Sequence, residues 1–232
     1  EKFDLFEKII ERCTTVYAPH KKINMIPNIL SDNFASLLEG KERISLTLWI
    51  HIDNDFNITG YKFQECLLVN KKAYSYDEAQ KKLKKDKTLK SLYNLSKHLA
   101  KNINYNCDEY DMHKMIEVYM ILANHLTAKH LIENNSPCIF RTHKSREHNI
   151  DFKSIDTKLV PFLKIFQSNA AEYTTYQGDY YHYGLNIHKY THFTSPIRRL
   201  PDILIHMLIK QLIGKFKMTH NIEQICQNCN DV

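Results

Sequence analysis

The side chains best suited to chemistry gather in one stretch, residues 181–208, where histidines, tyrosines and two adjacent arginines precede an apolar run. Ser195 and Pro196 are residue types favoured at the N-cap and the first position of a helix, and the apolar spacing beyond them predicts a helix over 197–213. The first turn of a helix presents unpaired backbone N–H groups and a positive dipole end, and the arginine fork fits a phosphate group. Two arginines in that turn therefore predict an anion-binding site.

An alternative interpretation stays open for these two residues, Arg198 and Arg199. Each could point into solvent, or pair with Asp202, which lies three or four positions further along the predicted helix. Residue types and spacing alone favour neither interpretation.

Two other patterns bring possible metal ligands close together. Asp53 and Asp55 lie between two predicted strands, where a turn is favoured over a metal site because Asn and Asp are common turn residues. Cys226 and Cys229 form a single CxxC pair, and zinc would need two further ligands that the chain does not clearly supply. Neither pattern predicts a metal centre.

The composition is that of a globular protein with a mild basic excess. Hydrophobic residues make up 43% of the 232, and 32 Lys and Arg face 26 Asp and Glu, with a sequence pI of about 8.8. A polyanionic partner is compatible with this charge but is not required by it. Six cysteines without a framework spacing favour a reduced, intracellular protein, either cytoplasmic or nuclear. No apolar run approaches the roughly 20 residues that span a bilayer, so no membrane association is expected.

Hydrophobic periodicity predicts the elements that must position these groups. Helices are expected over 3–10, from 77 through the lysine-rich run to 90, from there to about 102, and over 112–132, 151–167 and 197–213. Strands are expected over 14–17, 43–52, 58–69 and 138–140. The lysine-rich run 81–90 could contact phosphates, although a solvated helix face is favoured. Without internal repeats or a linker, the chain is predicted to form one α+β domain over 1–232.

The stretch 181–208 also resembles the hallmark segment of the ribonuclease II (RNB) family, which includes the catalytic subunit of the eukaryotic exosome. The matching residues are His182-Tyr183-Gly184-Leu185, Tyr190 and the run His192-Phe193-Thr194-Ser195-Pro196-Ile197-Arg198-Arg199. Further matches follow in the family's order over nearly the whole chain, among them Thr14-Thr15-Val16-Tyr17, Met25-Ile26-Pro27, Tyr76-Asp77-Glu78-Ala79-Gln80, Glu117, Asn124, Arg141, His143 and Tyr173.

The resemblance implies an RNB-type catalytic domain, a mixed sheet with several surrounding helices, that is incomplete at both ends. It also implies a processive 3′→5′ exoribonuclease that hydrolyses single-stranded RNA to nucleoside 5′-monophosphates. In this family a divalent metal, Mg²⁺ with Mn²⁺ also possible, activates water and neutralises charge on the phosphate. Flanking RNA-binding domains and partners in an RNA-decay complex are expected as well.

The family's site residues are carried over to matching positions in this sequence. Arg198 matches an arginine that contacts the scissile phosphate, and Glu117 lies near the reacting atoms; both are predicted to be catalytic. Tyr17 matches an aromatic clamp on the terminal nucleotide and Tyr76 a second base contact, although a core tyrosine with a satisfied hydroxyl stays open for each. The other predicted RNA-binding residues are His192, Thr194, Ser195 and Arg199.

The chain departs from the family in its metal ligands. The family's aspartate cluster, spaced Asp-x₅-Asp-x-Asp-Asp, is missing here, and we expect it upstream of Glu1, in a longer protein of which this chain is part. The chain alone is therefore predicted to hold no metal and to be inactive. Leu200, Val118 and Met207 stand where the family usually has Tyr, Glu and Arg. An inactive RNA-binding or scaffold remnant of the same fold is the alternative function.

Overall fold

A long hairpin forms where hydrophobic and polar residues alternate most regularly, and helices pack against it. The computed structural model describes residues 5–105, 109–144, 159, 170–175, 181–215 and 217–231. In it, β3 (Glu42–Ile52) pairs antiparallel with β4 (Ile58–Val69). Asp53 forms the turn between them, since its carboxylate accepts hydrogen bonds from the N–H groups of Asp55 and Asn57 at 2.9 and 2.8 Å. The turn predicted here is confirmed.

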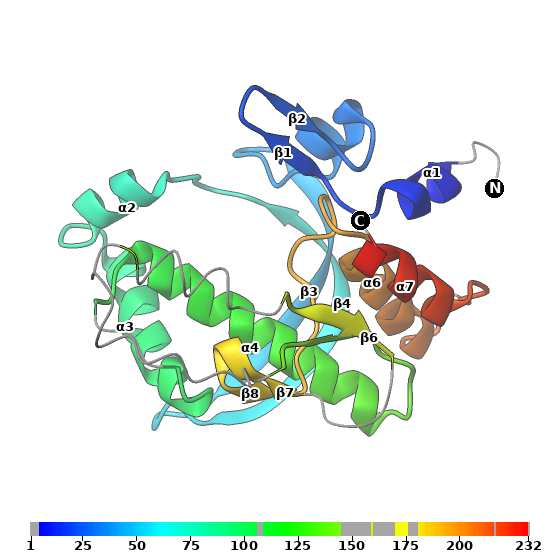
Figure 1. Ribbon diagram of the computed structural model, residues 1–232. Helices are drawn as coiled ribbons and strands as arrows, with labels where there is room; N and C mark the ends of the chain where they lie inside the picture. The colour runs from blue at the N-terminus through cyan, green and yellow to red at the C-terminus, as the bar shows by residue number, and fades with distance from the viewer. Residues whose placement is uncertain are drawn as a thin grey trace.

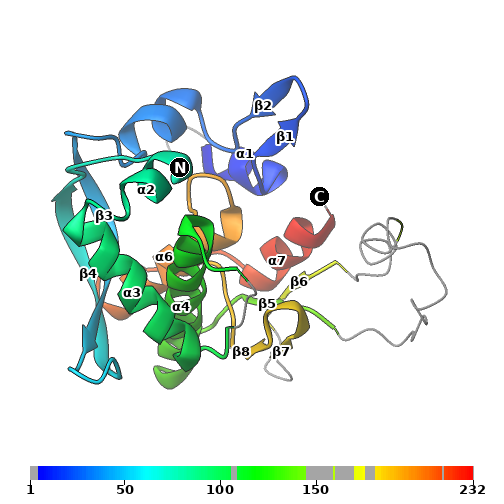
Figure 2. The ribbon, with the colours of Figure 1, turned by 90° about the vertical axis from the view of Figure 1, so that its left-hand side faces the viewer.

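One face of this hairpin is covered by a helical layer. The longest helix, α4 (Met112–Glu133), packs against α3 (Lys87–Asn102) and against the shorter α2 (Tyr76–Lys82), so that α2 and α3 lie on the outside (Figures 1 and 2). The predicted helix over 112–132 is confirmed, with Asp111 as its N-cap accepting from the Lys114 N–H at 2.9 Å. Apolar side chains from both α3 and α4 then meet the hairpin residues Leu48, Ile50 and Ile52.

A second layer lies beside α4 and contains the predicted C-terminal helix. Here α6 (Leu200–Leu212) is packed between α7 (Ile222–Asp231), α1 (Leu5–Arg12) and the C-terminal half of α4 (Figure 1). The core of this layer consists of fully buried α6 side chains, namely Leu200, Leu204, Ile205, Leu208 and Ile209.

The remaining strands are short and pair two by two. They are β1 (Val16–Ala18) with β2 (Lys21–Ile23), β5 (Phe140–Thr142) with β6 (Glu172–Thr174), and β7 (Tyr181–His182) with β8 (Ile187–His188). A π-helical turn, Leu30–Phe34, and a 3₁₀ turn, Tyr183–Leu185, complete the described elements. The α+β class is confirmed. Within the described residues, however, every sheet is a two-stranded antiparallel pair, so no larger mixed sheet is found there. The strands of three of these pairs are only two or three residues long.

The lysine-rich run differs from the prediction in its boundaries. Helix α2 ends at Lys82, and Asp86 caps a new helix by accepting a hydrogen bond from the Leu89 N–H at 3.0 Å, so the run spans a break between two helices. The predicted helix 151–167, the aromatic positions 176–180 and Cys107 lie outside the described residues. None of the helices described is both long and apolar enough to cross a membrane.

Candidate functional site

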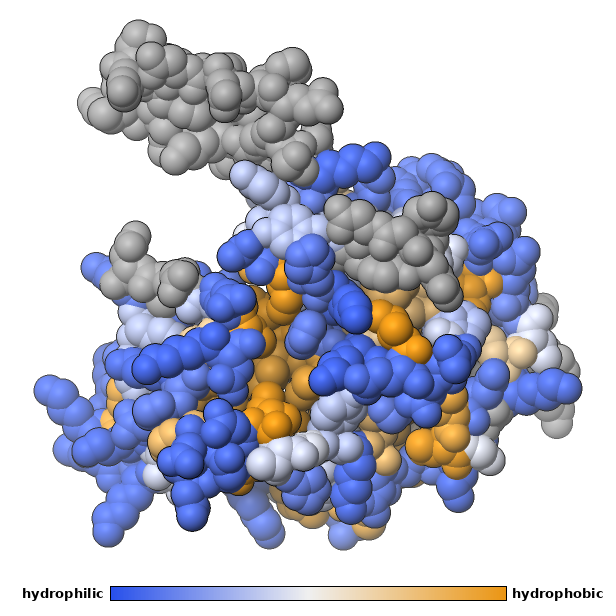
Figure 3. Space-filling model, turned by 90° about the horizontal axis from the view of Figure 1, so that it is seen from below, coloured by the Kyte–Doolittle hydropathy of each residue, from blue (hydrophilic) through white to orange (hydrophobic). Residues whose placement is uncertain are grey.

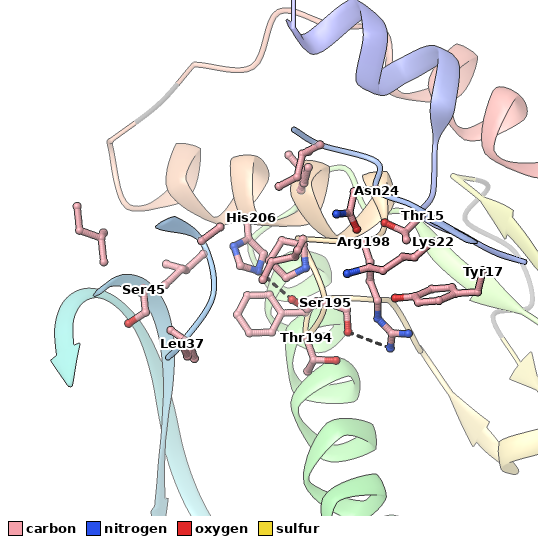
Figure 4. A pocket seen from close by; sticks show the side chains of 18 residues that line it. Thr15, Tyr17, Lys22, Asn24, Leu37, Ser45, Thr194, Ser195, Arg198 and His206 are labelled. Carbon is pink, nitrogen blue, oxygen red and sulfur yellow. Dashed lines mark hydrogen bonds between the residues drawn. The ribbon is translucent and has the colours of Figure 1, made fainter. Parts of the chain in front are cut away.

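A pocket of about 640 Å³ opens between the loop before α6 and the β1–β2 hairpin. The loop contributes Thr194, Ser195 and Arg198, and β1 contributes Tyr17 (Figure 4). Four of the predicted site residues are therefore brought together, although 181 residues separate Tyr17 from Arg198 in sequence. β3, the 35–37 segment and α6 add apolar residues to the wall.

Tyr17 and Arg198 both present their functional groups to this space (Figure 4). Tyr17 is 63% exposed, so the core-tyrosine interpretation is wrong for this residue. Arg198 is exposed, and its Nη2 donates a hydrogen bond to Ser195 Oγ at 3.4 Å. Among the described residues no carboxylate forms an ion pair with Arg198. An aromatic ring beside an uncompensated guanidinium can bind a ligand that carries both a ring and an anion.

The backbone of Arg198 is held by hydrogen bonds even though its side chain is exposed. Its carbonyl oxygen accepts hydrogen bonds from the Thr15 N–H at 3.0 Å and from Thr14 Oγ1 at 3.1 Å. Two residues later, the Leu200 N–H donates to the Cys13 carbonyl at 2.8 Å. The segment before β1 thus holds the loop from outside, and the position of the Arg198 backbone at the pocket is set by these contacts.

Arg199 has a different environment from its neighbour. Its Nε and Nη2 donate to the two carboxylate oxygens of Asp202 at 2.7 and 2.8 Å, and the Asp202 side chain is fully buried. The pairing with Asp202 that the sequence left open is thus confirmed for Arg199. Arg198 is exposed and does not pair with Asp202, so the anion contact predicted for it stays a prediction. The RNA contact predicted for Arg199 stays a prediction.

The predicted helix start at Ser195-Pro196 is wrong. Helix α6 begins at Leu200, with Arg199 at the N-cap position and Pro201 in the first turn, where a proline costs no hydrogen bond. The Ser195 N–H instead donates to Asp202 Oδ1 at 2.6 Å. With the Ser195 N–H bonded to Asp202, the chain forms a turn ahead of the helix. Arg198 lies in that turn.

A smaller hollow of about 160 Å³ lies on the other side of the loop and brings in Glu117. Thr194, Arg198 and Arg199 line it together with Glu117, which α4 supplies. The Glu117 carboxylate accepts a hydrogen bond from Lys114 Nζ at 2.8 Å, and this contact raises the pKa of Lys114. Glu117 is thus near Arg198, as predicted, but its charge is partly compensated.

His192 lies behind the loop and lines neither of these two spaces. Its Nδ1 is hydrogen-bonded to Tyr173 Oη at 2.8 Å, and Arg141 stacks on the Tyr173 ring with its Cζ 4.2 Å from the ring centroid. Burial, together with the nearby Arg199 and Arg141, lowers the pKa of His192 to about 2. The ring is therefore neutral at physiological pH, and its contacts favour a positioning role over the predicted contact with RNA.

Tyr76 also lies apart from the pocket. It is 44% exposed, which excludes a core role, and its ring stacks on His113 with centroids 3.7 Å apart. The base contact predicted for Tyr76 stays a prediction.

Several residues of the site carried no signal in the sequence. Lys22 and Asn24 reach the pocket from β2 and the residue after it, and His206 reaches it from α6 (Figure 4). His206 Nε2 is hydrogen-bonded to the Phe193 carbonyl at 2.8 Å, and Asn124 Oδ1 accepts from the Phe193 N–H at 2.9 Å. Of these four residues, Asn124 alone had a signal in the sequence, which is its match to the family pattern.

The described residues do not fit a metal ion. No three His, Cys, Asp or Glu side chains in the described part of the chain are grouped as metal ligands would be. The Asp53 carboxylate is occupied by its own turn. Cys229 lies on α7 within hydrogen-bonding reach of Cys13, and burial raises the pKa of its neighbour Cys226 to about 11. The structure gives the CxxC pair a place in the core.

Comparison with known proteins agrees with this geometry. The ribonuclease R of Buchnera aphidicola subsp. Schizaphis graminum is 30% identical over 89% of this chain and 38% of that protein. A solved structure of Mycoplasma genitalium RNase R in complex with ribose methylated single-stranded RNA superposes with a TM-score of 0.81, at 22% identity, over 100% of this chain and 48% of that one. Yeast Ssd1, described as a pseudonuclease, has a TM-score of 0.81 at 19% identity, over 99% and 36%.

These relatives are longer than the chain, which spans between a third and a half of their lengths. At 19% and 22% identity the two solved structures show the fold alone. The family model for the RNB domain matches residues 2–215. The chain belongs to the RNB domain family.

Proposed function

We propose that this chain is the RNA-binding and phosphate-contacting part of a processive 3′→5′ exoribonuclease, which hydrolyses single-stranded RNA to nucleoside 5′-monophosphates. The observation that carries the proposal is the pocket in which the ring of Tyr17 and the unpaired guanidinium of Arg198 face the same space. RNA as the ligand is supported by membership of the RNB family and by the RNA complex of the Mycoplasma relative.

In this proposal different pocket residues contact the base and the phosphate of one nucleotide. Tyr17 stacks on a base, an interaction worth roughly 1–3 kcal/mol that tolerates any base. Arg198 donates both prongs of its guanidinium to the phosphate, while Ser195 Oγ keeps the fork oriented. Lys22 lies on the same wall, where its ammonium forms an ion pair with Asp32 at 3.3 Å, so its charge is partly compensated. Thr194 lines both spaces, so it is placed to contact the strand between Arg198 and Glu117.

Hydrolysis in this family implies Mg²⁺ or Mn²⁺, which the described residues do not fit. Asp202 is paired with Arg199, and Glu117 with Lys114, so neither offers a free carboxylate. We propose that the ion is held by an aspartate cluster outside this chain. What this chain contributes to the reaction is Arg198, which stabilises negative charge developing on the phosphate.

The test uses single-stranded RNA with a labelled 5′ end. The purified chain should bind it but should not shorten it in Mg²⁺ or Mn²⁺, while the full-length protein should shorten it stepwise from the 3′ end. Shortening by the chain alone would contradict the metal assignment. Failure of the chain to bind RNA would contradict the pocket assignment.

A second candidate function is an RNA-binding or scaffold protein without catalysis. The fold is shared with yeast Ssd1, a pseudonuclease. In addition, Leu200 and Val118, which replace the family's usual Tyr and Glu, are fully buried and contribute only packing. A full-length protein that binds RNA but leaves it intact with every divalent metal would establish this alternative. Partners in an RNA-decay complex, flanking RNA-binding domains and an intracellular location belong to the proposal under either function.

A further inference from the structure

Positive charge is concentrated over α2, α3 and the segment before them. Residues 71–101 contain ten lysines and three acidic residues, a net charge of +7, whereas the whole chain carries +6. The rest of the chain, with 22 basic and 23 acidic residues, therefore carries −1. Helices α2 and α3 face the viewer in Figure 2, and hydrophilic side chains project from the same side of the molecule, at the left, in Figure 3. The basic excess of the protein thus belongs to one segment, most of which forms α2 and α3.

Four exposed lysines form a stripe along α3: Lys87, Lys90, Lys97 and Lys101. At about 100° per residue they fall within about 80° of one another around the helix, and the helix rises about 21 Å from the first to the last. We call this row the α3 lysine stripe. The side of the helix that packs inward carries its buried residues, which are Leu89, Ser96, Leu99 and Ala100.

Among the described residues, no acidic side chain forms an ion pair with a lysine of the stripe. Lys97 Nζ instead lies over the rings of Tyr93 and Tyr110, 4.5 and 5.4 Å from their centroids, which holds the ammonium in place without neutralising it. Like charges three and four positions apart on a helix destabilise it. A bound polyanion would relieve this repulsion.

We propose that the α3 lysine stripe is a second binding surface for RNA, which contacts the phosphate backbone outside the pocket of Tyr17 and Arg198. The ligand assignment rests on the proposed function. Lysine ammonium groups are compact point charges, which suit contacts to a phosphate backbone of any sequence. The stripe would hold a strand that is too long for the pocket and keep it on the protein.

The surroundings of the stripe favour RNA over a membrane surface. Helices that lie on a membrane carry apolar side chains that enter the lipid. The exposed apolar side chain that α3 does carry, Leu92, projects about 175° away from the middle of the stripe. The stripe therefore offers charge along its length and no apolar anchor.

The experiment compares two RNA lengths by fluorescence anisotropy with the purified chain. One oligonucleotide has about 5 nucleotides, enough for the pocket alone, and the other about 30, which can reach both surfaces. The variant Lys87→Gln/Lys90→Gln/Lys101→Gln removes three charges and keeps Lys97 packed on its tyrosines. The matched control, Lys8→Gln/Lys62→Gln/Lys217→Gln, removes three exposed lysines from other elements. Thermal unfolding checks that both variants are folded.

The wild-type chain should bind the longer RNA more tightly and with a steeper salt dependence than the shorter RNA. In the stripe variant this gain should largely disappear, and the slope of log affinity against log salt should fall by about 2, as expected for three lost contacts to a single strand. Binding of the short RNA should not change, and the control variant should behave as wild type.

If both triple variants lose the same affinity for the longer RNA, the loss reflects net charge alone and the proposal is overturned. So would stripe-dependent binding to phosphatidylserine vesicles combined with stripe-independent binding to the longer RNA. Lack of binding to the short RNA by the wild-type chain would contradict the proposed function of the pocket. The stripe is judged separately, from the difference between the two lengths.

Discussion

Arg199 is joined to Asp202 by two hydrogen bonds, at 2.7 and 2.8 Å, and through this carboxylate to the Ser195 N–H at 2.6 Å. Arg198, the adjacent residue, instead directs its side chain into the pocket (Figure 4). Two neighbouring arginines thus have separate tasks. One fixes the loop, and the other stays available to an anion.

The first prediction separates these tasks by stability. Arg199→Ala should lower the free energy of unfolding by about 3–5 kcal/mol, because it leaves the buried Asp202 carboxylate without its partner. Arg198→Ala is the matched control and should change it by no more than about 0.5 kcal/mol, as for most exposed positions. Urea denaturation of the purified chain measures both. Equal effects would show that the ion pair does not stabilise the loop.

The second prediction concerns turnover in the full-length protein. Arg198→Ala should lower the single-turnover rate of RNA hydrolysis by about 10² or more, because charge developing on the phosphate loses its stabilisation. RNA affinity should fall far less, since many other contacts hold the strand. Arg198→Lys should recover little, because an ammonium group cannot reproduce the two-pronged geometry. Equal losses of RNA affinity and rate would show that Arg198 binds the substrate and the transition state equally well.

The third prediction concerns the end product. In the full-length protein, Tyr17→Ala should release longer final products, because short RNAs lose the stacking platform that holds them in register. Tyr17→Phe keeps the ring and should leave the products unchanged. Tyr183→Ala removes a comparably exposed ring, 54% against 63%, that lines neither space beside the loop, and it serves as the control. Gel resolution of the products decides between these outcomes.

The fourth prediction is a loss of stability in acid that depends on His192. In the unfolded chain this histidine takes up a proton near its ordinary pKa of 6.5, whereas the folded environment lowers the pKa to about 2. The unfolded state therefore binds a proton that the folded state does not as the pH falls below about 6.5. This difference costs the fold about 1.4 kcal/mol per pH unit below that value, until the pH reaches the folded pKa.

Urea denaturation between pH 7 and pH 5 tests this dependence. His192→Asn should reduce the slope of stability against pH, whatever it does to stability at pH 7. His20→Asn, at an exposed histidine in the turn after β1, should keep the wild-type slope. An unchanged slope for His192→Asn would mean that His192 is protonated in the fold.

The sequence predicted those elements whose periodicity is strong and uninterrupted. The β3–β4 hairpin and α4 follow their hydrophobic patterns, and the asparagine and aspartates of the hairpin turn act as turn residues. The start of α6 was missed because two prolines compete. Local preference favours Ser195-Pro196, but the Ser195 N–H is bonded to the buried Asp202 carboxylate, and the helix starts at Leu200, directly before Pro201.

The site itself was predictable only in part. Resemblance singled out Tyr17 and Arg198, because the hallmark run and the Tyr17 region are both distinctive, and the structure places both residues at one pocket. Lys22 and Asn24 could not be found, since nothing in a short hairpin indicates what lies opposite it after folding. Tyr76 was selected by resemblance, but it lies apart from the pocket. Nothing in the sequence indicates that its ring is stacked on His113.

The contacts that hold the Arg198 carbonyl have a consequence for how the protein is made. Thr14 Oγ1 donates to that carbonyl across 184 residues of sequence. Contacts of such separation carry a high loop-closure entropy and form late in folding. During synthesis the segment around Thr14 therefore cannot make this contact until residue 198 has left the ribosome. Helices α3 and α4 can pair long before that point. A nascent or prematurely terminated chain could contain much of the fold and still lack any pocket for RNA.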